Sequence, residues 1–161
     1  NVPLDAASGG GISRREAYVD SALHWYHSTL RKGCAGFMFH KVLAKNLGAQ
    51  PVEAIAADSK LRLSHALKQL ETVWLHGENR FVGGRSMCVA DLLFACELEQ
   101  LQMLHRATDG TDMEEILHPF PNVCRWMSAV ASSASPVYGE VHAILDRASQ
   151  RRHDNLNKSK L

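Results

Sequence analysis

The sequence predicts an all-α protein built as a bundle of five to six helices. Apolar residues recur at intervals of three and four positions along most of the chain, which is the spacing of one face of an α-helix. Sustained alternation of apolar and polar residues, the pattern of a half-buried strand, hardly occurs. Apolar residues make up 45% of the 161 positions, a usual proportion for a globular domain with its own core.

The chain divides into three regions. Residues 1–12 contain three consecutive glycines and predict a linker or a ragged N-terminus. A helical domain is expected over residues 13–152, followed by a flexible tail over residues 153–161. Ser13 is the predicted N-cap of the first helix, because Glu16 three residues later completes the pattern of a capping box.

The first predicted helix has one face of mostly apolar or small residues. They are Tyr18, Ala22, Trp25, Tyr26, Thr29, Gly33 and Phe37. Gly33 and Gly36 lie inside this helix, where each costs about 1 kcal/mol relative to alanine. The two glycines predict either a bend or a close contact with another helix, and the bend is the favoured interpretation.

Four further helices follow. The second has an apolar stripe made of Leu63, Leu67, Leu70 and Trp74. The third, from about residue 88 to 104, is apolar nearly all round and is therefore expected at the centre of the bundle. Residues 108–111 predict a loop, Pro119 precedes a short helix, and Pro136 starts a last helix. That last helix carries Val141, Ile144 and Leu145, of which Ile144 and Leu145 are expected to pack against the bundle.

Charge and cysteine content restrict the function classes. The formal net charge is +1, which argues against electrostatic binding of nucleic acid or of a membrane surface. No apolar run reaches the about 18 residues of a membrane span. The chain begins with Asn1 and shows no leader pattern, so we expect a fragment or a processed chain. Four widely spaced cysteines are expected to be reduced thiols: Cys34, Cys88, Cys96 and Cys124.

Three segments together carry a family resemblance. Residues 24–43 read HWYHSTLRKGCAGFMFHKVL, residues 70–98 read LETVWLHGENRFVGGRSMCVADLLFACEL, and residues 121–130 read PNVCRWMSAV. In this order they resemble the C-terminal, all-helical domain of cytosolic-type glutathione transferases, and most of all the plant-like theta class. The resemblance covers about residues 14–150, which is nearly the whole chain.

The resemblance implies a divided chemistry. In such enzymes an N-terminal thioredoxin-like domain binds glutathione, and in theta members it supplies a serine that stabilises the thiolate nucleophile. The sequence shows none of the strands of that domain, so no catalytic residue is expected in this chain. The helical domain lines the hydrophobic electrophile pocket and contributes its first helix to a homodimer interface. The parent enzyme is expected to conjugate glutathione, its co-substrate, to electrophiles and to reduce organic hydroperoxides.

Residue by residue, the resemblance points to the first helix. Arg31 matches the family's active-site arginine, which attracts an anionic substrate or a glutathione carboxylate, although a solvated arginine would give the same pattern. Ala35 and Phe39 follow on the same helix face and border the electrophile pocket in the resemblance. Without it, an aromatic residue on a helix is usually a core residue. Ser28 matches a position near the glutathione site or the subunit interface, but a solvated hydroxyl is the favoured interpretation.

The start of the third helix departs from the family pattern. A Ser or Thr normally caps it, paired with an Asp three residues later in a capping box. Here Cys88 stands at the cap position and Asp91 completes the box. Because a thiol is a weak acceptor, we expect a weaker helix start. The functional alternative is a reactive Cys88, since a helix N-terminus lowers the pKa of a thiol.

Other chemistries have little support in the sequence. His24 and His27 lie three residues apart on one helix, but no further ligand completes a metal set, so no metal is expected. No hydrolase elbow motif or phosphate-binding loop occurs. The alternative to a transferase domain is a non-catalytic interaction module of the same fold, or a stand-alone helical protein that has lost catalysis.

The chain ends in a targeting signal. The last three residues, Ser159, Lys160 and Leu161, form the C-terminal tripeptide that the peroxisomal import receptor reads. We therefore expect a peroxisomal protein, with a cytoplasmic location as the alternative.

Overall fold

The computed structural model describes residues 13–77 and 79–158. Within these ranges it contains helices and a single isolated bridge between Phe81 and Gly84, but no strand. The all-α prediction is thus confirmed. Five long helices and two short ones form the described part of the chain, when helices that continue directly into π- or 3-10-helical segments are counted together.

The first long helix is built from four consecutive segments. They are α1 (Arg14–Trp25), the π-helical η1 (Tyr26–Leu30), α2 (Arg31–Met38) and the π-helical η2 (Phe39–Leu43). The predicted capping box is confirmed at its start, because the Ser13 hydroxyl accepts the Glu16 N–H and the Glu16 carboxylate accepts the Ser13 N–H. After a short 3-10 turn, η3 (Lys45–Leu47), Gly48 ends the helix in the left-handed region with φ of 71°.

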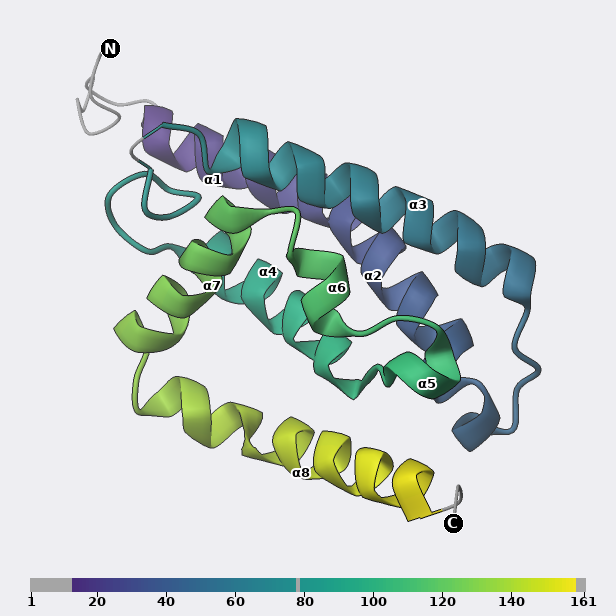
Figure 1. Cartoon of the computed structure of the whole chain (residues 1–161). Helices are drawn as coiled ribbons and strands as arrows, with labels where there is room; N and C mark the ends of the chain where they lie inside the picture. Colours follow the sequence, from purple (N-terminus) through teal and green to yellow (C-terminus); the bar gives the residue numbers. More distant parts are fainter. Residues whose placement is uncertain (1–12, 78, 159–161) are drawn as a thin grey trace.

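The second long helix lies alongside the first. It consists of α3 (Glu53–Gln69) and the π-helical η4 (Leu70–Trp74), and Figure 1 shows α3 running beside α1 and α2. All four residues of its predicted apolar stripe are buried. A Cβ added at Gly33 would lie only 2.5 Å from the backbone nitrogen of Leu63. The glycine therefore permits a close contact between α2 and α3, which is the interpretation that the sequence had not favoured.

The third long helix occupies the centre of the bundle, as predicted. It is formed by α4 (Val89–Glu99) and the 3-10 segment η5 (Gln100–Met103), and in Figure 1 it lies between the α2/α3 pair and α8. Its buried apolar residues are Ala90, Phe94, Ala95, Leu98 and Leu101. One side nevertheless remains open, because Val89 is 53% and Leu92 36% exposed.

Two short helices and a longer one follow: α5 (Arg106–Asp109), α6 (Met113–Leu117) and α7 (Pro121–Ser133). The expectation of a loop over residues 108–111 is therefore wrong in part, since α5 includes Thr108 and Asp109. The Asp109 carboxylate accepts the His105 N–H at 2.8 Å and so stabilises this single turn. Glu71 plays a similar part for α7, because its carboxylate accepts the N–H groups of Asn122 and Val123 at 3.0 and 2.9 Å.

The last helix, α8 (Val137–Lys158), extends beyond the predicted domain boundary. Residues 153–158 were expected in a tail but are helical. Arg152 explains this extension, because its two terminal nitrogens donate to the Asp109 carboxylate at 2.9 and 3.0 Å and hold the helix against α5. No helix of the described residues is long and apolar enough to cross a membrane.

The face of α8 that packs against the bundle was predicted wrongly. Ile144 is 72% exposed and Leu145 is only partly buried, whereas Tyr138, His142 and Ser149 are buried. The Tyr138 hydroxyl donates to Glu99 at 3.0 Å, and the Ser149 hydroxyl donates to the Gln102 carbonyl at 2.7 Å. Polar residues thus attach α8, so the apolar stripe did not mark its inner face.

Candidate functional site

Arg31, the first residue of α2, lies next to a buried polar pair. Its side chain is 56% exposed, and its Nη1 donates a hydrogen bond of 3.2 Å to the Tyr26 hydroxyl oxygen. The Tyr26 hydroxyl donates in turn to Glu97 Oε2 at 2.6 Å, and Arg31 Nη1 lies 4.0 Å from the same carboxylate oxygen. The guanidinium is therefore anchored on one side and open to solvent on the other.

The two partners of Arg31 belong to the core. Tyr26 is 2% and Glu97 4% exposed, and the Tyr26 ring stacks on Phe94 with a centroid distance of 5.5 Å. Burial and the hydrogen bond to Glu97 raise the pKa of Tyr26 to about 12, although Arg31 acts in the opposite direction. Sequence reasoning placed Tyr26 in the core but missed Glu97. A glutamate among the buried, mostly apolar residues of this helix is the signal that could have found it.

Ala35 and Phe39 follow Arg31 along the first helix, and both are partly buried. Phe39 stands outside the hydrophobic core, and its ring contacts His40 edge-on at 5.0 Å. The expectation that an isolated aromatic residue fills the core therefore does not hold here. This leaves a partly exposed ring and an exposed guanidinium on one helix.

Ser28, His24 and His27 are exposed on the same helix. The Ser28 hydroxyl donates to the carbonyl of His24 at 2.9 Å and lies 3.2 Å from that of Trp25, so it is satisfied within its own helix. In the described part of the chain, no group of three or more potential ligands could hold a metal ion.

Asp91 connects three parts of the fold although it is fully buried, with 0% exposure. Its Oδ2 accepts the Cys88 N–H at 2.8 Å, and its Oδ1 accepts the Val82 N–H at 2.7 Å and the Trp126 indole N–H at 2.8 Å. The Cys88 thiol occupies the position of a capping hydroxyl opposite Asp91. This carboxylate thus joins the start of α4 to the preceding loop and to α7, which is a structural role.

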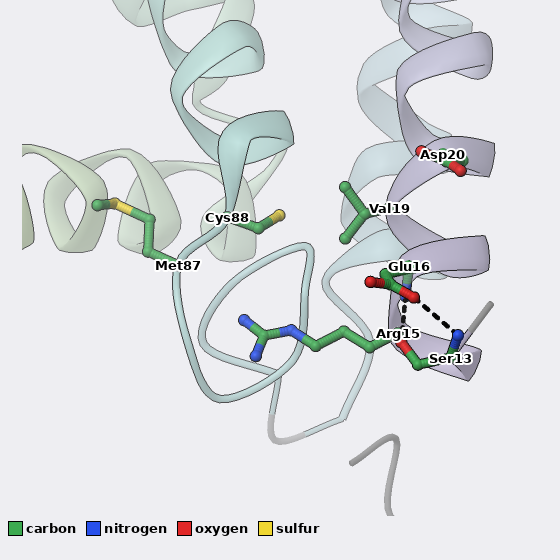
Figure 2. A pocket seen from close by; sticks show the side chains of 7 residues that line it. All are labelled: Ser13, Arg15, Glu16, Val19, Asp20, Met87 and Cys88. Carbon is green, nitrogen blue, oxygen red and sulfur yellow. Dashed lines mark hydrogen bonds between the residues drawn. The ribbon is translucent and has the colours of Figure 1, made fainter. Parts of the chain in front are cut away.

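An open groove of about 730 Å³ lies between the start of α1 and the segment before α4. Side chains from the first two turns of α1 line it together with Met87 and Cys88, and Figure 2 shows the Cys88 sulfur directed toward Val19. The groove brings together two helix starts that the sequence had identified separately. Arg31, Ala35 and Phe39 do not line it.

The four cysteines are free thiols in the structure. Burial raises the pKa of Cys88, and the negative charge of Asp91 raises it further. Burial also raises the pKa of Cys34 well above the usual thiol value. Burial and the charge of Asp91 both favour the protonated thiol of Cys88, which is the opposite of the lowered pKa expected for a reactive thiol at this helix start. The tripeptide expected to act as a targeting signal, Ser159, Lys160 and Leu161, lies outside the described residues.

Comparisons with known proteins agree on one family. Glutathione S-transferase T2 of Arabidopsis thaliana is 38% identical over 87% of this chain and 23% of its own length. Glutathione S-transferase T1 of the same species is 34% identical over 86% of this chain and 55% of its own length. Glutathione S-transferase theta-1 of Homo sapiens is 28% identical over 82% of this chain and 52% of its own length. The chain thus spans about half or less of the length of each of these relatives.

The family model supports the same conclusion. The model of the glutathione S-transferase C-terminal domain matches residues 34–134, which is more than half of the chain. This range begins in α2, contains all of α3 and α4, and ends just after α7. It includes Asp91 and Glu71, whose carboxylates accept hydrogen bonds at the starts of α4 and α7. The chain therefore belongs to the family of glutathione S-transferase C-terminal domains and has relatives in the theta class.

Proposed function

We propose that this chain is the helical domain of a theta-like glutathione transferase and that its first helix forms one wall of the electrophile pocket. The main support is the guanidinium of Arg31, which is anchored to buried Tyr26 and Glu97 yet has its side chain 56% exposed. Ala35 and Phe39 continue the wall along the same helix. An exposed guanidinium beside a partly exposed ring suits an apolar electrophile that carries an anionic group.

The reaction requires a second domain. A thioredoxin-like domain of the same polypeptide binds glutathione and stabilises its thiolate. The thiolate sulfur attacks the electrophilic carbon, a new S–C bond forms, and the leaving group departs with its electron pair. This domain also completes the electrophile cleft beside Arg31. That cleft is distinct from the groove at the start of α1, because Arg31 does not line the groove. Ser28 lies on the exposed side of the same helix, near the bound glutathione or the subunit interface of a homodimer.

The same pocket supports reduction of organic hydroperoxides. The glutathione thiolate attacks the terminal peroxide oxygen, the O–O bond breaks, and the alcohol leaves after taking up a proton. The resulting glutathione sulfenic acid condenses with a second glutathione to give the disulfide and water. A coupled assay with cumene hydroperoxide, glutathione reductase and NADPH tests this activity in the full-length natural protein.

A pair of matched electrophiles tests the role of Arg31. Para-nitrobenzyl chloride is neutral, whereas para-(chloromethyl)benzoate carries a carboxylate, and in both the glutathione sulfur displaces chloride from the benzylic carbon. In the full-length protein, Arg31→Ala should lower kcat/KM for the carboxylate substrate by about 10–100-fold, since a hydrogen bond to a charged group contributes about 1.5–3 kcal/mol. The neutral substrate should be affected little.

Arg62→Ala is the matched control, because the Arg62 side chain is 60% exposed but pairs with Asp58 on α3. Equal losses with both substrates, or the same selective loss in Arg62→Ala, would refute the role of Arg31. A full-length protein without conjugation or peroxidase activity would favour the alternative, a non-catalytic interaction module of this family.

We further propose import into peroxisomes through the C-terminal Ser159, Lys160 and Leu161. A fluorescent protein fused before residue 1 should colocalise with a peroxisomal marker, and deletion of Leu161 should leave it in the cytoplasm. Cytoplasmic fluorescence of the intact fusion would contradict the proposal.

A further inference from the structure

Arg31 contacts two buried side chains, Tyr26 and Glu97. We propose that Tyr26 and Glu97 are positioning residues, which hold the Arg31 guanidinium in the orientation that binds the anionic group of the substrate. This inference rests on the proposed function of Arg31 and adds two residues from the core to the specificity of the pocket.

The helix geometry brings Tyr26 and Arg31 together. Residues five positions apart are about 140° apart around a regular α-helix, so their side chains would point to different sides. Tyr26–Leu30 is instead a π-helical turn, and the Arg31 backbone N–H donates to the Tyr26 carbonyl. This wider turn places the guanidinium beside the phenolic hydroxyl, with 3.2 Å between Arg31 Nη1 and Tyr26 Oη. Single π-turns inserted in α-helices are often found at functional sites.

The Tyr26 ring has little freedom to turn. It stacks on Phe94 at an interplanar angle of 13°, and His27 packs against it edge-on at a centroid distance of 4.9 Å. Its hydroxyl donates to Glu97 Oε2 at 2.6 Å, so its oxygen is left to accept from Arg31. Arg31 Nη1 is thus fixed by a rigid phenol. The other N–H groups of the Arg31 guanidinium have no hydrogen bond to the described residues and can bind a carboxylate.

Glu97 supplies the charge that retains the guanidinium. A carboxylate that is 4% exposed needs a cation nearby, and Arg31 Nη1 lies 4.0 Å from its Oε2. Its other oxygen, Oε1, is buried and has no hydrogen-bond partner among the described residues. Selection for stability alone would not retain a buried carboxylate with one oxygen that lacks a hydrogen bond. Its presence beside Arg31 is accounted for if it neutralises and orients that arginine.

The experiment uses the full-length protein and the same two electrophiles. Tyr26→Phe removes the hydroxyl and keeps the ring, whereas Glu97→Gln removes the charge and keeps an acceptor for Tyr26. Each variant should raise KM for para-(chloromethyl)benzoate about fivefold, the effect of one hydrogen bond, and leave kcat/KM for para-nitrobenzyl chloride unchanged. In the Arg31→Ala background, Tyr26→Phe should add no further selective loss.

Tyr138→Phe and Glu99→Gln are the matched controls. Tyr138 also donates its hydroxyl to a glutamate of α4, Glu99, at 3.0 Å, but this pair attaches α8. Both controls should leave the preference between the two electrophiles unchanged. Activity with the neutral electrophile reports whether each variant is folded.

The outcomes separate the two proposals. If Arg31→Ala shows no selective loss, the proposed function of Arg31 fails. If Arg31→Ala is selective but Tyr26→Phe and Glu97→Gln are not, only the positioning role is overturned. Equal losses with both electrophiles in Tyr26→Phe and Glu97→Gln would also overturn it, because the preference for the anionic electrophile would then not depend on the pair. Additive losses in the double variant would show that Tyr26 acts independently of Arg31.

Discussion

At the scale of single residues, the start of α4 combines a strong carboxylate with a weak thiol. Asp91 accepts the Cys88 N–H at 2.8 Å, as the second residue of a capping box should. The reciprocal acceptor is the sulfur of Cys88, and sulfur accepts hydrogen bonds less well than a hydroxyl oxygen. Cys88→Ser should therefore raise the free energy of unfolding by about 0.5–2 kcal/mol, measured by urea denaturation.

Cys96→Ser is the control for this substitution, because Cys96 is an exposed thiol on the same helix without a capping role. It should change the free energy of unfolding little. The capping argument fails if Cys88→Ser gives no gain, or if Cys96→Ser gives the same gain.

A second prediction at this scale concerns the alkaline stability that depends on Tyr26. Burial and the hydrogen bond to Glu97 raise the pKa of Tyr26 from 10.0 to about 12, although Arg31 opposes the shift. Between these values the unfolded state loses the phenolic proton while the native state keeps it, so the free energy of unfolding falls as pH rises from 10 toward 12. Tyr26→Phe removes this contribution, and its stability should fall less steeply over the same pH interval in urea denaturation. If the free energy of unfolding falls equally with pH in the natural protein and in Tyr26→Phe, the raised pKa of Tyr26 is contradicted.

At the scale of helices, periodicity predicted those that are long and have an apolar inner face. The stripe from Leu63 to Trp74 is buried as predicted, because apolar burial determines how that helix packs. The short α5 was missed, since a single turn held by Asp109 and Arg152 has no periodicity to detect. The inner face of α8 was missed because its contacts are polar.

The candidate site was predictable to a similar extent. Arg31 and Phe39 were named as candidates because they match the family pattern within one helix. The contact between Tyr26, Arg31 and Glu97 depends on a π-helical turn and on a residue 71 positions away from Tyr26 in the chain. Neither leaves a local pattern in the sequence. A close helix contact at Gly33 could likewise be named only as one of two possibilities.

The contact between α2 and α3 gives a prediction for Gly33. A Cβ at this position would lie 2.5 Å from the Leu63 nitrogen and 2.8 Å from its Cα, and backbone atoms cannot move aside as a side chain can. Gly33→Ala should therefore lower the free energy of unfolding by about 1–3 kcal/mol, despite the better helix propensity of alanine. Gly139→Ala on α8 is the control, because nothing lies within 4 Å of its added Cβ, and it should raise stability by up to about 1 kcal/mol. Two changes of the same sign would contradict the close contact.

At the scale of the whole molecule, the exposed apolar residues concern association. Leu61 on α3 and Val141 on α8 are both 64% exposed, so both are available for contacts outside the bundle. The homodimer proposed above has the first long helix at its interface. We expect the second long helix, which packs beside the first and carries Leu61, to take part as well. We therefore expect the 161-residue chain to self-associate, with a mass in sedimentation that increases with concentration.

The substitution Leu61→Glu distinguishes this interface from non-specific association through exposed apolar residues. A glutamate in the interface loses the burial of a leucine and places a charge there, so the dissociation constant should rise about tenfold or more. Val141→Glu changes a residue of equal exposure, 64%, on a helix outside the proposed interface and should leave the constant unchanged. Circular dichroism spectra should be the same for all three proteins. A monomer mass at every concentration would show that the chain does not self-associate. An equal effect of both substitutions would place the interface elsewhere.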